Sequence, residues 1–239
     1  MRILFLLFTF LPLWVYAQKT QTFIYGIKTI ENKDSKMDEM INSVSPNYKN
    51  LVTDIRFNLV IKKDSSCFYL DKKTIPDDDG VDLFLALLNS SEKIFQTKDS
   101  IFEEVNLEHH NKKYILKDTI NSHWSLLNEK KSIMGYACYK ATCVKTVINE
   151  VGIFKNDIIA WYCPELPYQF GPYGYGKLPG LIFELQTKKA LFGIQKINLD
   201  AEDKLPQINK ILEFVSYKQL NENILKLRDE RKKMMGSQN

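Results

Sequence analysis

Two glutamates and two lysines in the second half of the chain have the side chains that general acid–base chemistry requires. Glu165 and Glu184 flank a loop rich in proline and glycine, and Lys140 and Lys177 are candidate ionic partners for them. A pair of carboxylates beside a lysine can take up and deliver protons. However, no nucleophile with a neighbouring base accompanies them, and structural ion pairs far outnumber catalytic ones. We therefore interpret these residues as ion pairs that fasten the loop, and we predict no catalytic residue.

Cysteine is the other reactive residue type in the sequence. The chain contains Cys67, Cys138, Cys143 and Cys163, and outside the cytoplasm an even number of cysteines favours disulfide bonds. Cys138 and Cys143 are five residues apart in one predicted strand, so their side chains point to opposite faces. They do not bond to each other without a bend in that strand. A cross-strand partner such as Cys163 fits better, whereas an unpaired cysteine would allow thiol chemistry.

Metal and cofactor sites are not predicted. The cysteine spacings match no zinc or haem pattern. His109 and His110 are adjacent in a predicted turn without a nearby carboxylate–histidine partner, so a metal site there is a poor alternative. The acidic run at residues 77–80 lacks the alternating ligands and the distal glutamate of a calcium loop. We interpret it as the start of a helix that Asp79 caps.

The first 17 residues have the features of a signal peptide. Arg2 provides a positive charge, residues 3–15 form an apolar run, and the small Ala17 allows cleavage before Gln18. A run this short is typical of a signal peptide rather than of a membrane-spanning helix. The sequence thus predicts an exported protein, periplasmic or extracellular, with no transmembrane segment in the mature chain. The net charge is only weakly basic, and an exported protein rarely meets nucleic acid, so nucleic acid is not an expected partner.

Short segments with β-type patterns dominate residues 18–239, which we predict to form a single domain. Residues 51–62 give the clearest example, with apolar side chains at every second position. A short apolar helix is predicted at residues 81–88, and a helical tail from about residue 218. The other predicted strands, joined by polar turns such as one at 155–157, are residues 22–30, 67–71, 93–97, 100–107, 114–118, 123–128, 132–136, 138–154, 158–163, 178–188 and 191–199. This order favours an antiparallel sheet over βαβ units.

The most distinctive segment is residues 164–180. It holds four of the chain's eight prolines and four of its ten glycines, interleaved with Tyr168, Phe170, Tyr173 and Tyr175. Proline fixes φ, and glycine permits φ values that other residues avoid. This composition therefore predicts a loop that aromatic packing holds in one shape.

This loop and two segments before it resemble the GLPGLI family, a group of exported proteins typical of Bacteroidetes. The matching segments are Gly-Lys-Leu-Pro-Gly-Leu-Ile at 176–182, Ile-Met-Gly-Tyr-Ala-Cys-Tyr-Lys-Ala-Thr at 133–142, Ala-Trp-Tyr-Cys-Pro-Glu-Leu-Pro at 160–167 and Gly-Pro at 171–172. Lys177 stands where the first name-giving glycine usually sits, which argues against a strict need for positive φ there. Cys163 stands where the family has threonine. The resemblance does not imply any activity for this chain.

The resemblance marks a candidate binding loop and one candidate disulfide. The motif residues are Trp161, Tyr162, Gly171, Pro172, Leu178, Pro179, Gly180, Leu181 and Ile182. Because Cys163 departs from the family, a local disulfide with Cys143, peculiar to this member, is expected. Two interpretations of the loop are open. Its aromatic residues fill one end of the sheet, or it forms the lip of an apolar pocket or a docking surface.

We expect a mainly β fold with minor α: a curved antiparallel sheet with a short internal helix and a C-terminal helix. By analogy with periplasmic lipoprotein carriers, the sheet would form a half-open barrel whose concave apolar face is filled by the helix at residues 81–89 or by a ligand. The predicted function is non-enzymatic binding of a hydrophobic ligand, such as a lipid, or of an envelope protein partner. The alternatives are a hydrolase or thiol-active periplasmic enzyme that uses Glu165, Glu184 or a free cysteine, and a structural or assembly component of an envelope complex.

Overall fold

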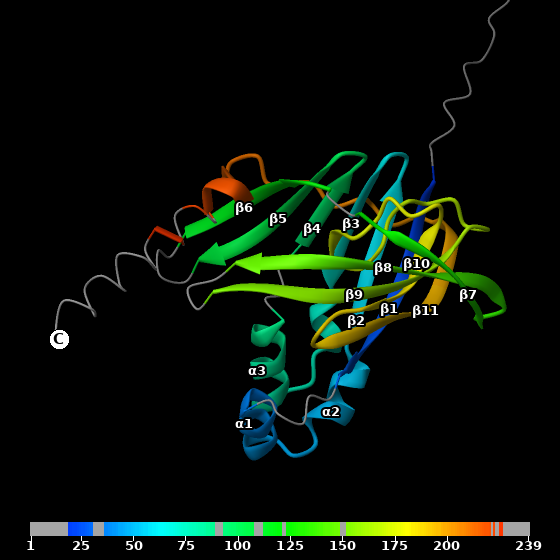
Figure 1. Ribbon diagram of the computed structural model, residues 1–239. Helices are drawn as coiled ribbons and strands as arrows, with labels where there is room; N and C mark the ends of the chain where they lie inside the picture. The colour runs from blue at the N-terminus through cyan, green and yellow to red at the C-terminus, as the bar shows by residue number, and fades with distance from the viewer. Residues whose placement is uncertain are drawn as a thin grey trace, which may run out of the picture.

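The computed structural model describes residues 19–30, 36–88, 93–107, 112–120, 123–148 and 152–220, together with 222 and 225–226. Within these residues, twelve strands form one sheet, which is strongly curved (Figure 1). In chain order they are β1 (Thr20–Thr29), β2 (Arg56–Lys62), β3 (Ser65–Leu70), β4 (Lys93–Thr97), β5 (Ser100–Leu107), β6 (Lys112–Thr119), β7 (Ser125–Ile133), β8 (Tyr136–Ile148), β9 (Ile153–Cys163), β10 (Leu181–Gln186), β11 (Ala190–Ala201) and β12 (Glu213–Ser216).

The order of strands across the sheet is β12-β6-β5-β4-β3-β2-β1-β11-β10-β9-β8-β7. Every neighbouring pair is antiparallel except β12 and β6, which run parallel. Because β12 and β7 are the two edges, the sheet is not closed into a barrel. The expected mainly β fold with a curved antiparallel sheet is therefore confirmed. The closer likeness to periplasmic lipoprotein carriers stays a prediction.

Three short helices gather below the sheet in Figure 1: α1 (Lys36–Val44), α2 (Tyr48–Leu51) and α3 (Asp79–Leu87). Single 3-10 turns are η1 (Val52–Asp54), η2 (Lys72–Thr74) and η4 (Pro172–Gly174). No helix in the described part of the chain is long and apolar enough to cross a membrane. The expected signal peptide lies outside the described residues. The same holds for much of the expected C-terminal helix, of which residues 217–220, 222 and 225–226 are described and helical.

Several predicted strand boundaries are wrong. The predicted strand at 132–136 crosses the turn at residues 134–135 that joins β7 to β8, and the predicted strand at 138–154 runs past the end of β8 at Ile148. The predicted strand at 51–62 begins only at Arg56, because α2 and η1 occupy the residues before it. The predicted turn at 155–157 lies inside β9 instead. Lys155 and Asp157 are exposed there, so a polar sequence is compatible with a strand at this position.

The start of α3 accounts for the acidic run at residues 77–80. The cap is Asp78 and not Asp79, since Oδ1 of Asp78 accepts a hydrogen bond from the amide of Val81 at 3.0 Å. Oδ2 accepts a hydrogen bond from the Ser45 hydroxyl at 2.8 Å, which is the main cause of the lowered pKa of Asp78. A Cβ on Gly80 would lie 2.6 Å from Cβ of Ser45. The run therefore caps α3 and lets the end of α1 approach it closely.

The expected internal helix exists, but it does not fill the curve of the sheet. The main contacts of α3 are with α1 and α2. The segment that contacts β3 and β4 is η4, which belongs to the loop between β9 and β10. Of the two segments, the loop between β9 and β10, and not the helix predicted at residues 81–89, therefore has the main contacts with β3 and β4.

Candidate functional site in the signature loop and a pocket beside the helices

Residues 164–180, called the signature loop below, form a folded element tied to the sheet by its main chain. The amide of Leu181 donates a hydrogen bond to the carbonyl of Leu166 at 2.9 Å. Within the loop, the amide of Lys177 donates to the carbonyl of Gln169 at 3.0 Å. Main-chain pairing at both ends fixes the shape of the loop, as its proline and glycine content predicted.

Tyr173 carries the aromatic contact between the signature loop and the sheet. Its φ of 56° lies in the left-handed region, which non-glycine residues seldom adopt. The centre of its ring is 4.9 Å from that of Phe192, 5.6 Å from that of Phe68 and 6.4 Å from that of Phe57. These three rings come from β11, β3 and β2. The loop thus contributes a side chain to the core, which agrees with the aromatic packing expected from the sequence.

Three polar atoms where the loop meets β4 have no hydrogen-bond partner among the described residues. They are the side-chain nitrogen and oxygen of Gln96 and the hydroxyl oxygen of Tyr173. Gln96 is 2% exposed, and a Cβ on Gly176 would lie 2.5 Å from its Nε2, so the loop backbone packs directly on it. An unpaired buried polar group costs about 1–3 kcal/mol. The unpaired polar atoms of Gln96 and Tyr173 therefore offset part of the stability that the aromatic contacts of Tyr173 contribute.

Most motif residues are buried. Tyr162, Gly171, Pro172, Leu178, Gly180, Leu181 and Ile182 are buried, Trp161 is half-buried and Pro179 is exposed. Gly171 lies against the side chain of Ile182, where a Cβ would come within 2.7 Å. The buried side chains do not reach a ligand while the loop keeps this conformation. Their assignment as a binding loop stays a prediction.

Trp161 lies in a row of charged side chains on neighbouring strands. The strand registers place Lys140 on one side of it and Glu184 on the other. Nζ of Lys131, on β7, is 4.4 Å from the centre of the Trp161 ring and 2.5 Å from Oε2 of Glu184. Lys131 therefore connects edge strand β7 with β10 across the face of the tryptophan.

The expected pairing of Lys140 and Lys177 with Glu165 and Glu184 is wrong. The observed pairs are Lys131–Glu184, Lys140–Glu129 and Lys177–Asp99, with N···O distances of 2.5, 2.9 and 3.6 Å. Glu165 instead accepts a hydrogen bond from the amide of Ala137 at 3.3 Å. Glu165 and Glu184 therefore have separate partners. This arrangement is typical of structural contacts and not of two catalytic carboxylates that share a proton.

The expected disulfide between Cys143 and Cys163 is wrong as well. All four cysteines are free. Cys143 pairs with Ile158 in the β8–β9 register, so it lies five residues along β9 from Cys163. At about 3.3 Å per residue, the two positions are too far apart to bond. Burial raises the pKa of Cys67 and Cys138 to about 12 and that of Cys143 to about 11, which keeps these thiols protonated at neutral pH.

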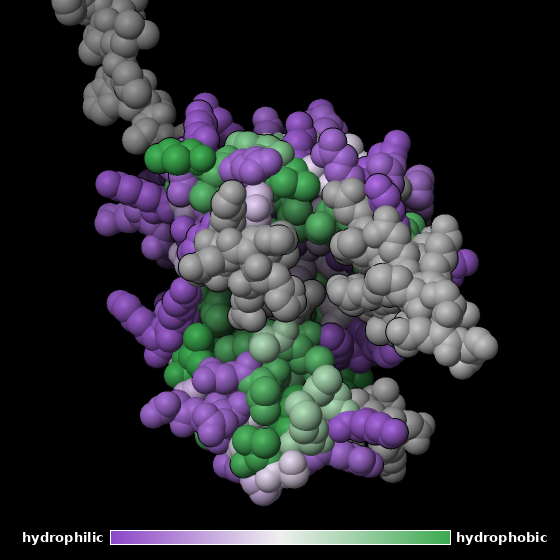
Figure 2. Space-filling view, turned by 90° about the vertical axis from the view of Figure 1, so that its left-hand side faces the viewer, coloured by the Kyte–Doolittle hydropathy of each residue, from purple (hydrophilic) through white to green (hydrophobic). Residues whose placement is uncertain are grey.

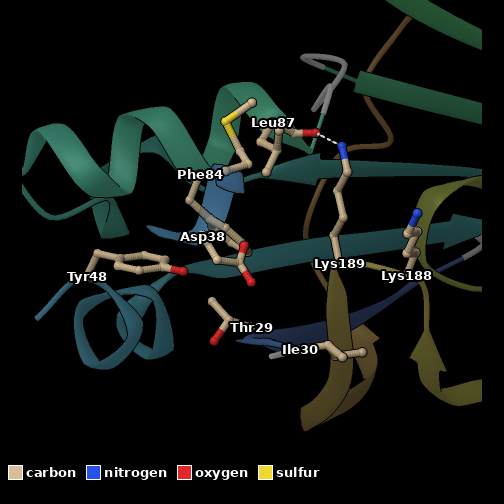
Figure 3. A pocket seen from close by; sticks show the side chains of 9 residues that line it. Thr29, Ile30, Asp38, Tyr48, Phe84, Leu87, Lys188 and Lys189 are labelled. Carbon is tan, nitrogen blue, oxygen red and sulfur yellow. Dashed lines mark hydrogen bonds between the residues drawn. The ribbon is translucent and has the colours of Figure 1, made fainter. Parts of the chain in front are cut away.

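A pocket of about 170 Å³ lies beside the helices (Figure 3). Its walls come from the end of β1, from all three helices and from the turn between β10 and β11. The lining residues are Thr29, Ile30, Met37, Asp38, Tyr48, Phe84, Leu87, Lys188 and Lys189. Five of these nine side chains are predominantly apolar. The rings of Tyr48 and Phe84 lie 6.1 Å apart, with Tyr48 only 1% exposed, and form a rigid wall.

The open side of the pocket carries two lysines. Nζ of Lys189 donates a hydrogen bond to the carbonyl of Leu87 at the end of α3, as Figure 3 shows. A cation at this position is favoured, because the C-terminal end of a helix carries partial negative charge. Partial burial, and then the neighbouring charge of Lys188, lower the pKa of Lys189. The pocket thus combines an apolar wall with a positive rim.

No local pattern in the sequence marks the pocket or Gln96. The pocket is assembled from five segments, and Lys188 and Lys189 read as an ordinary polar turn between two strands. Gln96 sits in a short strand between Phe95 and Thr97, without any feature that indicates an unpaired amide. Within the described residues, no group of three or more His, Cys, Asp or Glu residues could hold a metal ion. His109 and His110 lie outside them.

Comparisons with known proteins find one family that is similar to part of the signature region. Residues 148–184 match the family described as "Protein of unknown function (Porph_ging)", and no curated protein matches the chain. Two solved structures of PNGF-II, in space groups P21 and C2, are similar to it with TM-scores of 0.52 and 0.50 and 14% and 15% identity. Each alignment covers 87% of this chain and 33% of the other, so the chain spans a third of their length and shares only a fold with them. Over residues 148–184 the chain is therefore similar to the Porph_ging family of unknown function, which agrees with the resemblance of residues 176–182 to the GLPGLI signature.

Proposed function

We propose that this protein is an exported, non-enzymatic envelope protein that binds a small hydrophobic ligand, such as part of a lipid, in the pocket beside the helices. The observation that carries the proposal is the pocket, with its volume of about 170 Å³ and its apolar wall. An engineered apolar cavity of about 150 Å³ in another protein binds benzene. A single ring or a short stretch of acyl chain therefore fits here.

The charged residues at the rim of the pocket indicate which polar group the ligand carries. Lys188 and Lys189 lie at its open side, and Asp38 already has an interaction partner of its own. An anionic group at the end of an apolar ligand would meet these lysines while the apolar part contacts Phe84 and Leu87. A fatty acid carboxylate, or an anionic aromatic compound, has this combination.

Filling the pocket should abolish binding of such a ligand. Leu87→Trp places an indole in the pocket, and we expect at least a tenfold weaker Kd for an anionic naphthalene dye, followed by its fluorescence. Ala86→Trp is the matched control, because residue 86 is exposed on the same helix and does not line the pocket. If Leu87→Trp and Ala86→Trp bound the dye with equal affinity, the pocket would not be the binding site.

The proposal that the protein is exported predicts the N-terminus of the mature chain. If the signal peptide is removed after Ala17, mass spectrometry of the protein purified from its native cells should find Gln18 at the N-terminus. A chain that still begins at Met1 would contradict periplasmic or extracellular localisation. It would leave the ligand proposal intact, because the described residues that line the pocket fall between Thr29 and Lys189.

A nucleophilic cysteine needs a lowered pKa and access to substrate. Cys67, Cys138 and Cys163 are buried, and the pKa of the half-buried Cys143 is raised to about 11, which weighs against a thiol-active enzyme. The separate partners of Glu165 and Glu184 weigh against a hydrolase that uses both carboxylates.

A protein partner is the second candidate, and one observation favours it. Met37, Met40 and Val44 follow one face of α1 and are 41%, 45% and 48% exposed. Figure 2 shows hydrophobic residues at the surface in the lower part of the molecule, where the helices lie. An exposed apolar stripe on a helix is a common contact for an envelope protein partner, and an assembly component would use the same surface.

A further inference from the structure

Two cysteines meet at the start of the signature loop. The β8–β9 ladder ends with Tyr139 paired to Tyr162, and one further step in the same register brings Cys138, in β8, opposite Cys163, the last residue of β9. Both are 0% exposed. Burial, and then the neighbouring Cys163 thiol, raise the pKa of Cys138, and no covalent bond joins the two side chains.

Facing positions of antiparallel strands have the Cα spacing that a disulfide needs. Residues that face each other in antiparallel strands have Cα atoms about 4.5–5.5 Å apart. Disulfides join Cα atoms about 4.4–6.8 Å apart, with both Cβ atoms directed to the same side. Closing the bond therefore requires side-chain rotation but no shift of register. We propose that Cys138 and Cys163 form a disulfide that fastens β8 to the start of the signature loop when the chain folds in an oxidising compartment.

The other two cysteines do not compete for this bond. Cys143 faces Ile158 across β8 and β9. Cys67, on β3, faces Val60 and Phe95 on its two neighbouring strands. Neither has a cysteine opposite it, so the strand registers select one of the possible pairings.

The bond forms by thiol–disulfide exchange with a disulfide-bearing oxidant, either a protein or oxidised glutathione. The thiolate of one cysteine attacks a sulfur of the oxidant and releases one thiol, which leaves a mixed disulfide. The thiolate of the other cysteine then displaces the second thiol of the oxidant. The pair loses two electrons and two protons, and the oxidant gains them as two thiols. Because both side chains are buried once folded, this exchange precedes the closing of the core.

The disulfide would act on the start of the loop. The carbonyl of Cys163 accepts a hydrogen bond from the amide of Leu166 at 3.3 Å, and Gly180 packs on the same carbonyl. Joining residue 163 to residue 138 closes a loop of about 25 residues in the unfolded chain, which stabilises the fold through the lost chain entropy. We expect the oxidised chain to melt roughly 5–10 °C above the reduced chain.

Trypsin allows a direct test because it separates the four cysteines. The peptides are 64–72 with Cys67, 132–140 with Cys138, 141–145 with Cys143 and 156–177 with Cys163. The full chain is purified from its native envelope, alkylated while denatured but unreduced, and digested. The expected result is alkyl groups on Cys67 and Cys143 only, with 132–140 linked to 156–177. Four alkylated cysteines, or a link through Cys67 or Cys143, would overturn the proposal.

A second arm separates this proposal from that of export, on which the oxidising compartment rests. The reduced full chain is refolded with reduced and oxidised glutathione and analysed in the same way. A 138–163 link in the refolded chain but not in the native protein supports the pair and contradicts export. No link in either arm refutes the pair itself. Cys143→Ser is the matched control and should keep both the link and the rise in Tm, whereas Cys138→Ser should lose both.

Discussion

Replacing Gly180 by alanine is expected to lower the free energy of unfolding by about 4 kcal/mol or more, enough to abolish stable folding in many domains. A Cβ at this position would lie 2.1 Å from the carbonyl oxygen of Cys163, 2.5 Å from its carbonyl carbon and 2.8 Å from the nitrogen of Pro164. All three are backbone atoms, so no side-chain rotation relieves the clash. The φ of Gly180 is 155°, a value that residues with a Cβ rarely adopt.

Gly135→Ala is the matched control for this prediction. Gly135 also has a positive φ, of 85°, but nothing lies within 4 Å of its ideal Cβ position. Its replacement should therefore cost only about 1–2 kcal/mol, the price of the left-handed backbone alone. Urea unfolding followed by circular dichroism gives both values. If Gly180→Ala cost no more than Gly135→Ala, the close contact between the two ends of the loop would not matter to stability.

The glycines of the signature region thus have different physical roles, which the sequence alone does not separate. Gly180 brings two backbone segments together, and Gly171 leaves room for Ile182. Lys177, which stands in place of the first family glycine, has a φ of 62°. The argument that this position does not need a positive φ is therefore wrong, and its preference for glycine follows from the backbone conformation.

Local patterns predicted the parts of the fold that local forces decide. Alternation of apolar residues located β2 and β1, and an apolar run located α3, because one face of each element is buried. The cap was misplaced by one residue because Asp78 and Asp79 are both suitable N-caps. What selects Asp78 is its contact with Ser45, 33 residues away.

The ion pairs and the pocket depend on contacts that sequence spacing does not encode. The register between β9 and β10 shifts between Ile182 and Glu184, and that between β7 and β8 shifts between Leu126 and Lys130. Such irregularities decide which charged side chains become neighbours, since a slip of one residue moves a side chain to the other face. This explains why Glu184 meets Lys131 and not the lysines nearest to it in the motif.

Removing the ring of Tyr173 should lower the free energy of unfolding by about 3 kcal/mol, the lower end of the range for a buried aromatic side chain, because Tyr173 is only partly buried. In Tyr173→Ala the contacts with Phe57, Phe68 and Phe192 are lost, and the signature loop no longer contributes to the core. Urea unfolding followed by circular dichroism measures the loss. A cost below about 1 kcal/mol would mean that the loop covers the sheet without stabilising it.

Tyr173→Phe separates the packing of this ring from its polarity. The hydroxyl has no partner among the described residues, so its removal should leave stability unchanged or raise it by up to about 1 kcal/mol. The same unfolding measurement decides the sign. A loss of more than about 1 kcal/mol would show that the hydroxyl is hydrogen-bonded in solution, for instance through a buried water shared with Gln96. The difference in unfolding free energy between Tyr173→Ala and Tyr173→Phe therefore measures how much stability the aromatic ring of Tyr173 contributes.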